Sequence, residues 1–253
     1  MKVFKTSFNF SKLNKHKHQK VEIYYTDSHN IYFNLALEQS LYENNLVYPR
    51  LMLWKNDQSI IIGKYQNQWK ECNMFNLINE NVPFIRRKTG GGTVYHDLGN
   101  ICFTFITPIF DKDIYSLDPR QDNVQILQSA MNILGISTGL TKRKDLTFKE
   151  KKISGSAYQA NMGNKQGDNK KCLHHGTLLL NADIKKLWKY INTETKNINC
   201  KGQESVISQV CNLRDFFQDL SDEKVFEAIS DAFINFYQVQ NFEVLKSKNV
   251  NIK

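Results

Sequence analysis

The spacing of hydrophobic residues changes several times along the chain, and each spacing predicts a different kind of element. Short runs rich in β-branched and aromatic residues, bounded by turn residues, are typical of strands. Strands are predicted on this basis at residues 21–25, 51–54, 59–63, 84–87, 101–107, 173–180 and 242–245, and a strand–turn–strand unit is predicted at 148–158.

Helical spacing, in which apolar residues recur every three to four positions, is found in four segments. The first is 30–44, and the second is 67–80, which Pro83 should end because the residue before a proline avoids the α conformation. The third should begin at Pro119, and the fourth should have Ser221 as its N-cap. Strands and about four helices without regular alternation predict an α+β fold rather than a doubly wound parallel sheet.

One domain is expected, because 253 residues of which 41% are hydrophobic can bury a single sizeable core. We place this domain at residues 22–253. The polar stretch 161–171 has no periodicity and is expected to be a mobile loop. No apolar run approaches the ~18 residues that a membrane span requires, so no membrane role is expected.

The formal net charge of +9 is concentrated at the N-terminus. Residues 1–21 contain six lysines and no acidic residue, which leaves a charge of only +3 on the remainder. This distribution argues against a nucleic-acid partner. A basic, acid-free, serine-containing extension suits a mitochondrial transit peptide, although it lacks arginine. The alternative is a lysine-rich extension without a targeting signal, in which case the protein would be cytoplasmic.

The cysteines show neither a C-x-x-C pair nor a cluster with histidines at zinc-binding spacing. An odd number in a chain of this length favours free thiols in a reducing compartment. The five positions are Cys72, Cys102, Cys172, Cys200 and Cys211.

Residues 86–100 contain the strongest chemical signal, because three consecutive glycines at 90–92 follow two arginines. Glycines let a ligand approach main-chain N–H groups, and arginines pair with anions. The spacing matches neither the P-loop nor the G-x-G-x-x-G pattern. We therefore predict an anion-binding loop between two strands, formed as a hairpin; the alternative is a glycine-rich turn whose flanking charges face water.

This stretch resembles the signature of the lipoate–protein ligase A family, Arg-Arg-x-x-Gly-Gly-Gly-x-Val-aromatic-His-Asp-Leu-Gly-Asn. Similarity to the family extends to residues 34–38, 63–73, 152–158 and 174–183. The resemblance implies the catalytic domain that biotin and lipoate ligases share, a central mixed β-sheet flanked by helices and related to class II tRNA-synthetase cores.

The resemblance also implies an activity. Members use ATP and Mg²⁺ to activate lipoate as lipoyl-AMP and attach it to a lysine of lipoyl domains in 2-oxoacid dehydrogenase subunits and of the glycine-cleavage H protein. Bacterial members usually add a small C-terminal accessory domain, which we expect to be absent here. The chain would then need a separate accessory subunit, transfer preformed lipoyl-AMP, or take lipoyl groups from another protein.

Lys152 is the main catalytic candidate, since small residues follow it and its charge could bind a carboxylate and the α-phosphate. By resemblance, Arg87 would pair with phosphate and the main chain of Gly92, Thr93, Val94 and Tyr95 would contact the nucleotide. Lipoate would contact Thr89, Lys152, His175 and Trp54, although His175 and Trp54 could instead be core residues. Asp145 is a weak candidate for a position near the nucleotide and the metal.

Neighbouring polar residues have other expected roles. His96, Asp97 and Asn100 should stabilise the loop through local hydrogen bonds. His174 should point to the face of its strand opposite His175, because side chains alternate along a strand.

Two other functions stay open. Residues 172–176 resemble the Cys-x-x-His-Gly stretch of an octanoyltransferase family, so Cys172 is an alternative nucleophile for octanoyl or lipoyl transfer through a thioester. A buried cysteine is inert by default, however, because reactivity requires a lowered pKa. The other function is an inactive lipoyl-domain binding module, and biotin ligation is a related alternative.

Overall fold

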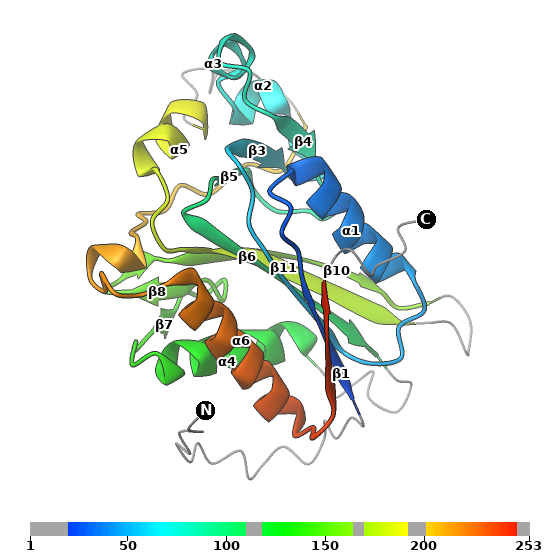
Figure 1. Ribbon diagram of the computed structural model, residues 1–253. Helices are drawn as coiled ribbons and strands as arrows, with labels where there is room; N and C mark the ends of the chain where they lie inside the picture. Colours follow the sequence, from blue (N-terminus) through cyan, green and yellow to red (C-terminus); the bar gives the residue numbers. More distant parts are fainter. Residues whose placement is uncertain (1–19, 110–117, 164–169, 192–200, 247–253) are drawn as a thin grey trace.

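The computed structural model describes residues 20–109, 118–163, 170–191 and 201–246 (Figure 1). Residues 1–19 of the basic extension and residues 164–169 of the predicted loop therefore lie outside the described residues. Within the described ranges, no helix is both long and apolar enough to cross a membrane.

A six-stranded mixed sheet forms the centre of the molecule, with strand order β10-β11-β6-β2-β1-β12. β1 runs parallel to β2 and β12, whereas the pairs β2–β6, β6–β11 and β11–β10 are antiparallel. The predicted mixed sheet is confirmed. Its strands are β1 (Val21–Tyr25), β2 (Arg50–Trp54), β6 (Asn100–Pro108), β10 (Ser154–Asn161), β11 (Lys171–Leu179) and β12 (Phe242–Lys246).

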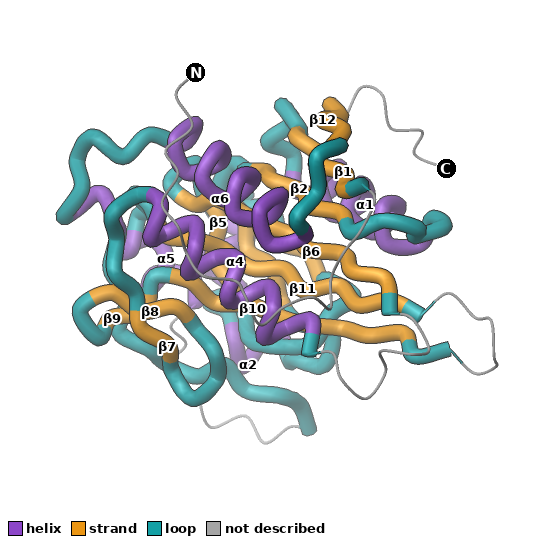
Figure 2. Tube along the Cα trace, turned by 90° about the horizontal axis from the view of Figure 1, so that it is seen from below, coloured by secondary structure: helices purple, strands orange, loops and turns teal. Residues whose placement is uncertain are grey.

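Helices cover both faces of this sheet (Figures 1 and 2). One apolar core lies between the sheet and the helices α4 and α6, and a second lies beneath α1. Every residue of β6 is buried, as expected for a strand whose two faces are both covered. The three helices are α1 (Ile31–Glu43), α4 (Pro119–Ile133) and α6 (Asp222–Tyr237).

Local capping explains where these helices begin and end. The side chain of Asn30 accepts hydrogen bonds from the main-chain N–H groups of Tyr32 and Phe33 at the start of α1. Ser221 is the N-cap of α6, as predicted, and its side chain accepts from the N–H of Lys224. Gly135 follows α4 with a φ of +75°, a conformation that favours glycine.

The segment 67–80 was predicted as one helix, and this is wrong. It forms two short helices, α2 (Gln68–Glu71) and α3 (Met74–Asn79), because Cys72 is extended and Asn73 caps a new helix by accepting from the N–H of Asn76. A further helix that we did not predict, α5 (Ile184–Ile191), packs near α3 and β5.

The glycine-rich segment also differs from the expected hairpin. It leaves β4 (Phe84–Arg86) and enters β5 (Val94–His96), a strand that we did not predict. Because β3 (Ser59–Ile62) lies between these two strands in a three-stranded sheet, residues 87–93 cross the end of β3. We call residues 87–93 the glycine loop.

The third sheet, which also has three short strands, positions Lys152. It contains β7 (Gly139–Leu140), β8 (Leu146–Phe148) and β9 (Lys151–Lys152), and a turn at residues 149–150 joins the last two. Lys149 and Glu150 both have positive φ angles, of 47° and 63°. The predicted strand–turn–strand unit is thus present. A short 3₁₀ helix, Leu213–Asp215, precedes α6.

Candidate active site

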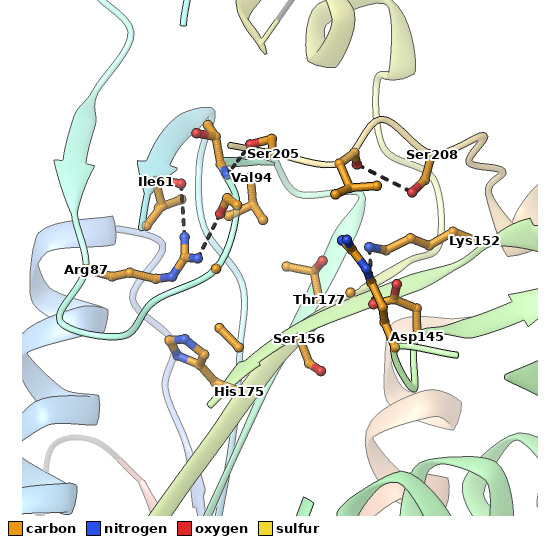
Figure 3. Close-up of a pocket in the computed structure, with 18 of the residues that line it drawn as sticks. Ile61, Arg87, Val94, Asp145, Lys152, Ser156, His175, Thr177, Ser205 and Ser208 are labelled. Carbon is orange, nitrogen blue, oxygen red and sulfur yellow. Dashed lines mark hydrogen bonds and ion pairs between the residues drawn. The ribbon is translucent and has the colours of Figure 1, made fainter. Parts of the chain in front are cut away.

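A cavity of about 560 Å³ lies between the glycine loop, strands β10 and β11, and residues 203–208. In Figure 3, His175, Ser156 and Thr177 lie along the sheet side, and Ser205 and Ser208 lie opposite them. The charged lining residues are Arg87, Arg120, Arg143, Asp145, Lys152 and Glu204. The apolar lining residues are Leu35, Trp54, Ile61, Val94, Ala157 and Val206.

Close contact between two chain segments shapes the glycine loop. A Cβ atom added to Gly63, at the end of β3, would lie 2.1 Å from the carbonyl oxygen of Gly91. Gly91 itself has a φ of +88°, which strains any other L-residue. Glycine at these two positions is therefore needed to bring the loop across the end of β3.

The side chain of Arg87 points into the loop and stabilises it. Its Nε donates to Thr89 Oγ1 at 2.9 Å, and its Nη2 donates to the carbonyl oxygens of Gly90 and Gly92 at 2.6 and 2.7 Å. Its Nη1 donates to the carbonyl oxygen of Ile61 at 3.3 Å. Burial lowers the pKa of Arg87 to about 10, so it stays charged at neutral pH. These four bonds use four of the five N–H donors of Arg87, so bidentate pairing with phosphate, as predicted, would require it to give up at least one of them.

A chain of buried hydrogen bonds connects the glycine loop to α1. Thr89 Oγ1 lies 2.8 Å from His175 Nε2, and His175 Nδ1 lies 2.7 Å from Glu38 Oε1. Glu38 also accepts from Thr104 Oγ1 at 2.6 Å, which in turn accepts from Trp54 Nε1 at 3.2 Å. Three predicted lipoate contacts, Thr89, His175 and Trp54, therefore belong to one network. Trp54 and His175 line the cavity, whereas Thr89 is buried behind the lining. Sequence analysis gave Glu38 no role.

Lys152 lies at the other end of the cavity (Figure 3). Its Nζ is 3.2 Å from Asp145 Oδ1, and the two side chains are 26% and 14% exposed. A Cβ on Gly155 would lie 2.8 Å from this Nζ. Gly155, one of the small residues that follow Lys152, thus makes room for the lysine side chain itself.

Residues 203–205 contact the glycine loop. Ser205 Oγ accepts from the N–H of Thr93 at 2.9 Å, and Gln203 Oε1 accepts from the N–H of Gly91 at 3.3 Å. Side-chain oxygens thus bind main-chain N–H groups of the glycine-rich segment that we predicted to bind an anion. The sequence offered no distinctive signal for this segment.

The remaining loop candidates have structural contacts. Asp97 Oδ1 accepts from the N–H of Gly99 and from Asn100 Nδ2, which fits the predicted stabilising role. His96 is buried against Asn56, and burial lowers its pKa to about 3. The ring of Tyr95 is buried and stacks on Tyr190, so only its main chain could serve a ligand.

Cys172 lies on β11 but does not line the cavity. It is fully buried, and burial raises the pKa of its thiol to about 12. Both features oppose its use as a nucleophile. His174 is also on the far face, as predicted, and its ring lies beside those of Phe103 and Phe105.

Comparison with known proteins identifies the family. Residues 30–234 match the model of the lipoyl protein ligase A/B catalytic domain. The chain belongs to this family. It is also 33% identical to P. falciparum LipL1, solved in complex with lipoate, with a TM-score of 0.69 over 86% of this chain and 60% of that one. The protein is accordingly an enzyme of the lipoate–protein ligase family, as the sequence motifs implied.

Two more distant structures share the fold. The bi-partite lipoate protein ligase of Thermoplasma acidophilum, studied with its E2 lipoyl domain, has a TM-score of 0.74 at 23% identity, covering 91% of this chain and 89% of that one. A lipoate-protein ligase A bound with ATP has a TM-score of 0.70 at 24% identity, covering 92% and 90%. The chain spans 60% of the length of LipL1 but most of the length of these two proteins.

Metal ligands are sparse in the described part of the chain, where no group of three or more His, Cys, Asp or Glu side chains could hold a metal ion. The acidic side chains that line the cavity are Asp145 and Glu204, which pair with Lys152 and Lys70. These residues do not form a Mg²⁺ site by themselves. Mg²⁺ is commonly bound through substrate phosphates with one or two carboxylates, and Asp145 could supply one.

Proposed function

We propose that this enzyme activates lipoate with ATP and attaches the lipoyl group to a lysine of lipoyl domains. The observation that carries the proposal is the layout of the cavity. The Lys152–Asp145 pair lies at one end, and Trp54 and His175 line the other. An acyl chain with a terminal carboxylate fits this layout, with the chain beside Trp54 and the carboxylate beside the Lys152 ammonium group.

In the first step a carboxylate oxygen of lipoate attacks the α-phosphorus of ATP. The bond between this phosphorus and the bridging oxygen to the β-phosphate breaks, and pyrophosphate leaves with the electron pair. Lys152 offsets the negative charge of the approaching carboxylate and α-phosphate, which would otherwise repel each other. The chain needs no covalent nucleophile for this step, in agreement with the burial of Cys172.

In the second step the neutral ε-amine of the acceptor lysine attacks the acyl carbon. The carbon–oxygen bond to AMP breaks, AMP leaves as an anion, and the nitrogen releases its proton to solvent. The acceptors we propose are lipoyl domains of 2-oxoacid dehydrogenase subunits and the glycine-cleavage H protein. The T. acidophilum ligase studied with an E2 lipoyl domain supports this class of acceptor. A mitochondrial location, suggested by the basic extension, is part of the same proposal.

A narrower activity is the second candidate, in which the chain only transfers lipoate from preformed lipoyl-AMP and depends on a separate accessory subunit for activation. The bi-partite organisation of the T. acidophilum ligase supports this candidate. Octanoyl or lipoyl transfer through Cys172 is less well supported, because the thiol is buried outside the cavity.

The test is lipoylation of an isolated lipoyl domain by the purified protein, measured by mass spectrometry. One reaction contains lipoate, ATP and Mg²⁺, and the other contains preformed lipoyl-AMP. A lipoyl domain without its acceptor lysine is the control. We expect modification in both reactions. Modification from lipoyl-AMP alone would support the transferase, and modification from neither would refute both candidates.

A further inference from the structure

Two arginines that sequence analysis did not single out line the same cavity as Lys152. Arg120 lies in the first turn of α4, and Arg143 lies in the turn between β7 and β8. Both side chains are exposed. Among the described residues, neither forms an ion pair with a carboxylate. Their guanidinium donors are therefore available to an anion at the cavity, although the Arg120 charge also acts on the Asp118 carboxylate.

The structure holds these two arginines on one side of the cavity. Lys144 Nζ donates to Asp118 Oδ2 at 2.7 Å, which ties the turn between β7 and β8 to the start of α4. Arg143 is next to Lys144, and Arg120 is two residues after Asp118. The Arg120 guanidinium carbon also lies 5.8 Å from the ring centroid of Tyr158 on the edge strand β10. Arg120 thus lies beside this edge of the sheet, and Arg143 lines the same cavity from the turn that Lys144 ties to the start of α4.

The other charged side chains of the cavity already have partners. Arg87 binds carbonyl oxygens of the glycine loop, Lys152 pairs with Asp145, and Glu204 pairs with Lys70. Arg120 and Arg143 therefore give this end of the cavity an excess of two positive charges. Guanidinium groups favour phosphate because their planar donors match two phosphate oxygens at once.

We propose that Arg120 and Arg143 bind the β- and γ-phosphates of the nucleoside triphosphate, an assignment that rests on the proposed function. Lys152 would then face the α-phosphate, and the arginines would hold the part that leaves as pyrophosphate. Their charge would stabilise the bridging oxygen as its bond to the α-phosphorus breaks and the electron pair moves to pyrophosphate. AMP lacks these phosphates and should not need either arginine.

Binding to the purified full-length protein tests this directly. Kd values for ATP, AMP and inorganic pyrophosphate are measured by calorimetry for the wild type, Arg120→Ala, Arg143→Ala and the double variant. Lys142→Ala is the matched control, because this exposed lysine is in the same turn as Arg143 but does not line the cavity. Each arginine variant should bind ATP and pyrophosphate about tenfold more weakly, as expected for the loss of one charge-assisted contact, with AMP binding unchanged.

Several results would overturn the assignment. These are equal losses for AMP and ATP, unchanged ATP affinity in the double variant, or a wild type that binds ATP no better than AMP. The arginines could instead bind an acidic acceptor protein. In that case the double variant would raise the KM for the lipoyl domain in transfer from preformed lipoyl-AMP and leave ATP binding intact, which also refutes the proposal. Arginine-dependent ATP binding without lipoylation would refute the proposed function but support this assignment.

Discussion

Two neighbouring histidines on β11 have opposite environments. His175 faces the cavity and bonds to Thr89 and Glu38 through its two ring nitrogens. His174 faces the core beneath α4 and α6, and in the described structure neither ring nitrogen has a hydrogen-bond partner. Burial lowers the pKa of His174 to about 3, so its ring is neutral in the folded protein.

The comparison separates two functions of one strand. The face with His175 and Thr177 places polar groups where a substrate can reach them, and the face with Cys172 and Leu178 builds the apolar core. Substitutions on the cavity face should therefore change activity more than stability, and substitutions on the core face should do the reverse.

The largest effect on the cavity side is expected for Lys152→Ala. Removing the cation that faces the reacting carboxylate and α-phosphate should lower lipoylation by about 10²–10³-fold, the usual cost of losing one electrostatic contact to the transition state. Steady-state lipoylation gives the rate, and circular dichroism checks that the variant is folded. A variant with normal activity would remove Lys152 from the mechanism.

Gly155→Ala should give a smaller loss by moving the same lysine. The added Cβ would lie 2.7 Å from Lys152 Cε, and this flexible side chain can move aside at little cost in stability. We expect activity to fall about tenfold or more, since small displacements of a catalytic group are costly. The Tm should change little. Unchanged activity with a displaced lysine would show that the ammonium position is not critical.

On the core face, His174→Leu should change the pH dependence of stability. The pKa of His174 rises from about 3 in the folded protein to about 6.5 in the unfolded chain. The unfolded state therefore takes up a proton as the pH falls below about 6.5, and the wild type loses stability down to about pH 3.

For this histidine the loss between pH 8 and pH 5 should be about 2 kcal/mol. The His174→Leu variant should not show this loss of stability. Urea unfolding at both pH values, for wild type and variant, measures the difference, and lipoylation should be unchanged. Equal pH dependence in both proteins would mean that His174 does not titrate as its burial implies.

Cys172→Ala should have the smallest effect. Activity should stay at the wild-type level because the thiol lies outside the cavity, and the free energy of unfolding should fall by about 1 kcal/mol for the lost buried volume. Since burial raises its thiol pKa to about 12, Cys172 should also react slowly with iodoacetamide at pH 8. Loss of transfer in a folded variant would restore the thioester mechanism.

Local signals predicted most of the fold. Apolar spacing and capping residues located α1, α4 and α6, and strand alternation placed His174 and His175 on opposite faces. The failures had two causes, a local pattern that fitted two structures and an element too short to be recognised. The apolar residues of 67–80 suited one helix, but Asn73 starts a second one, and the three residues of β5 were too few to be recognised as a strand.

The sequence by itself determined the family, the glycine loop and the identity of the candidate lysine, because each depends on residues that are close together in the chain. Only the tertiary structure brought Asp145 to Lys152, joined Glu38 to His175, and gathered Arg120 and Arg143 at one cavity. Helical and strand periods specify which side of an element a residue faces. They do not specify which distant element will lie opposite, since that depends on how the sheets and helices pack together.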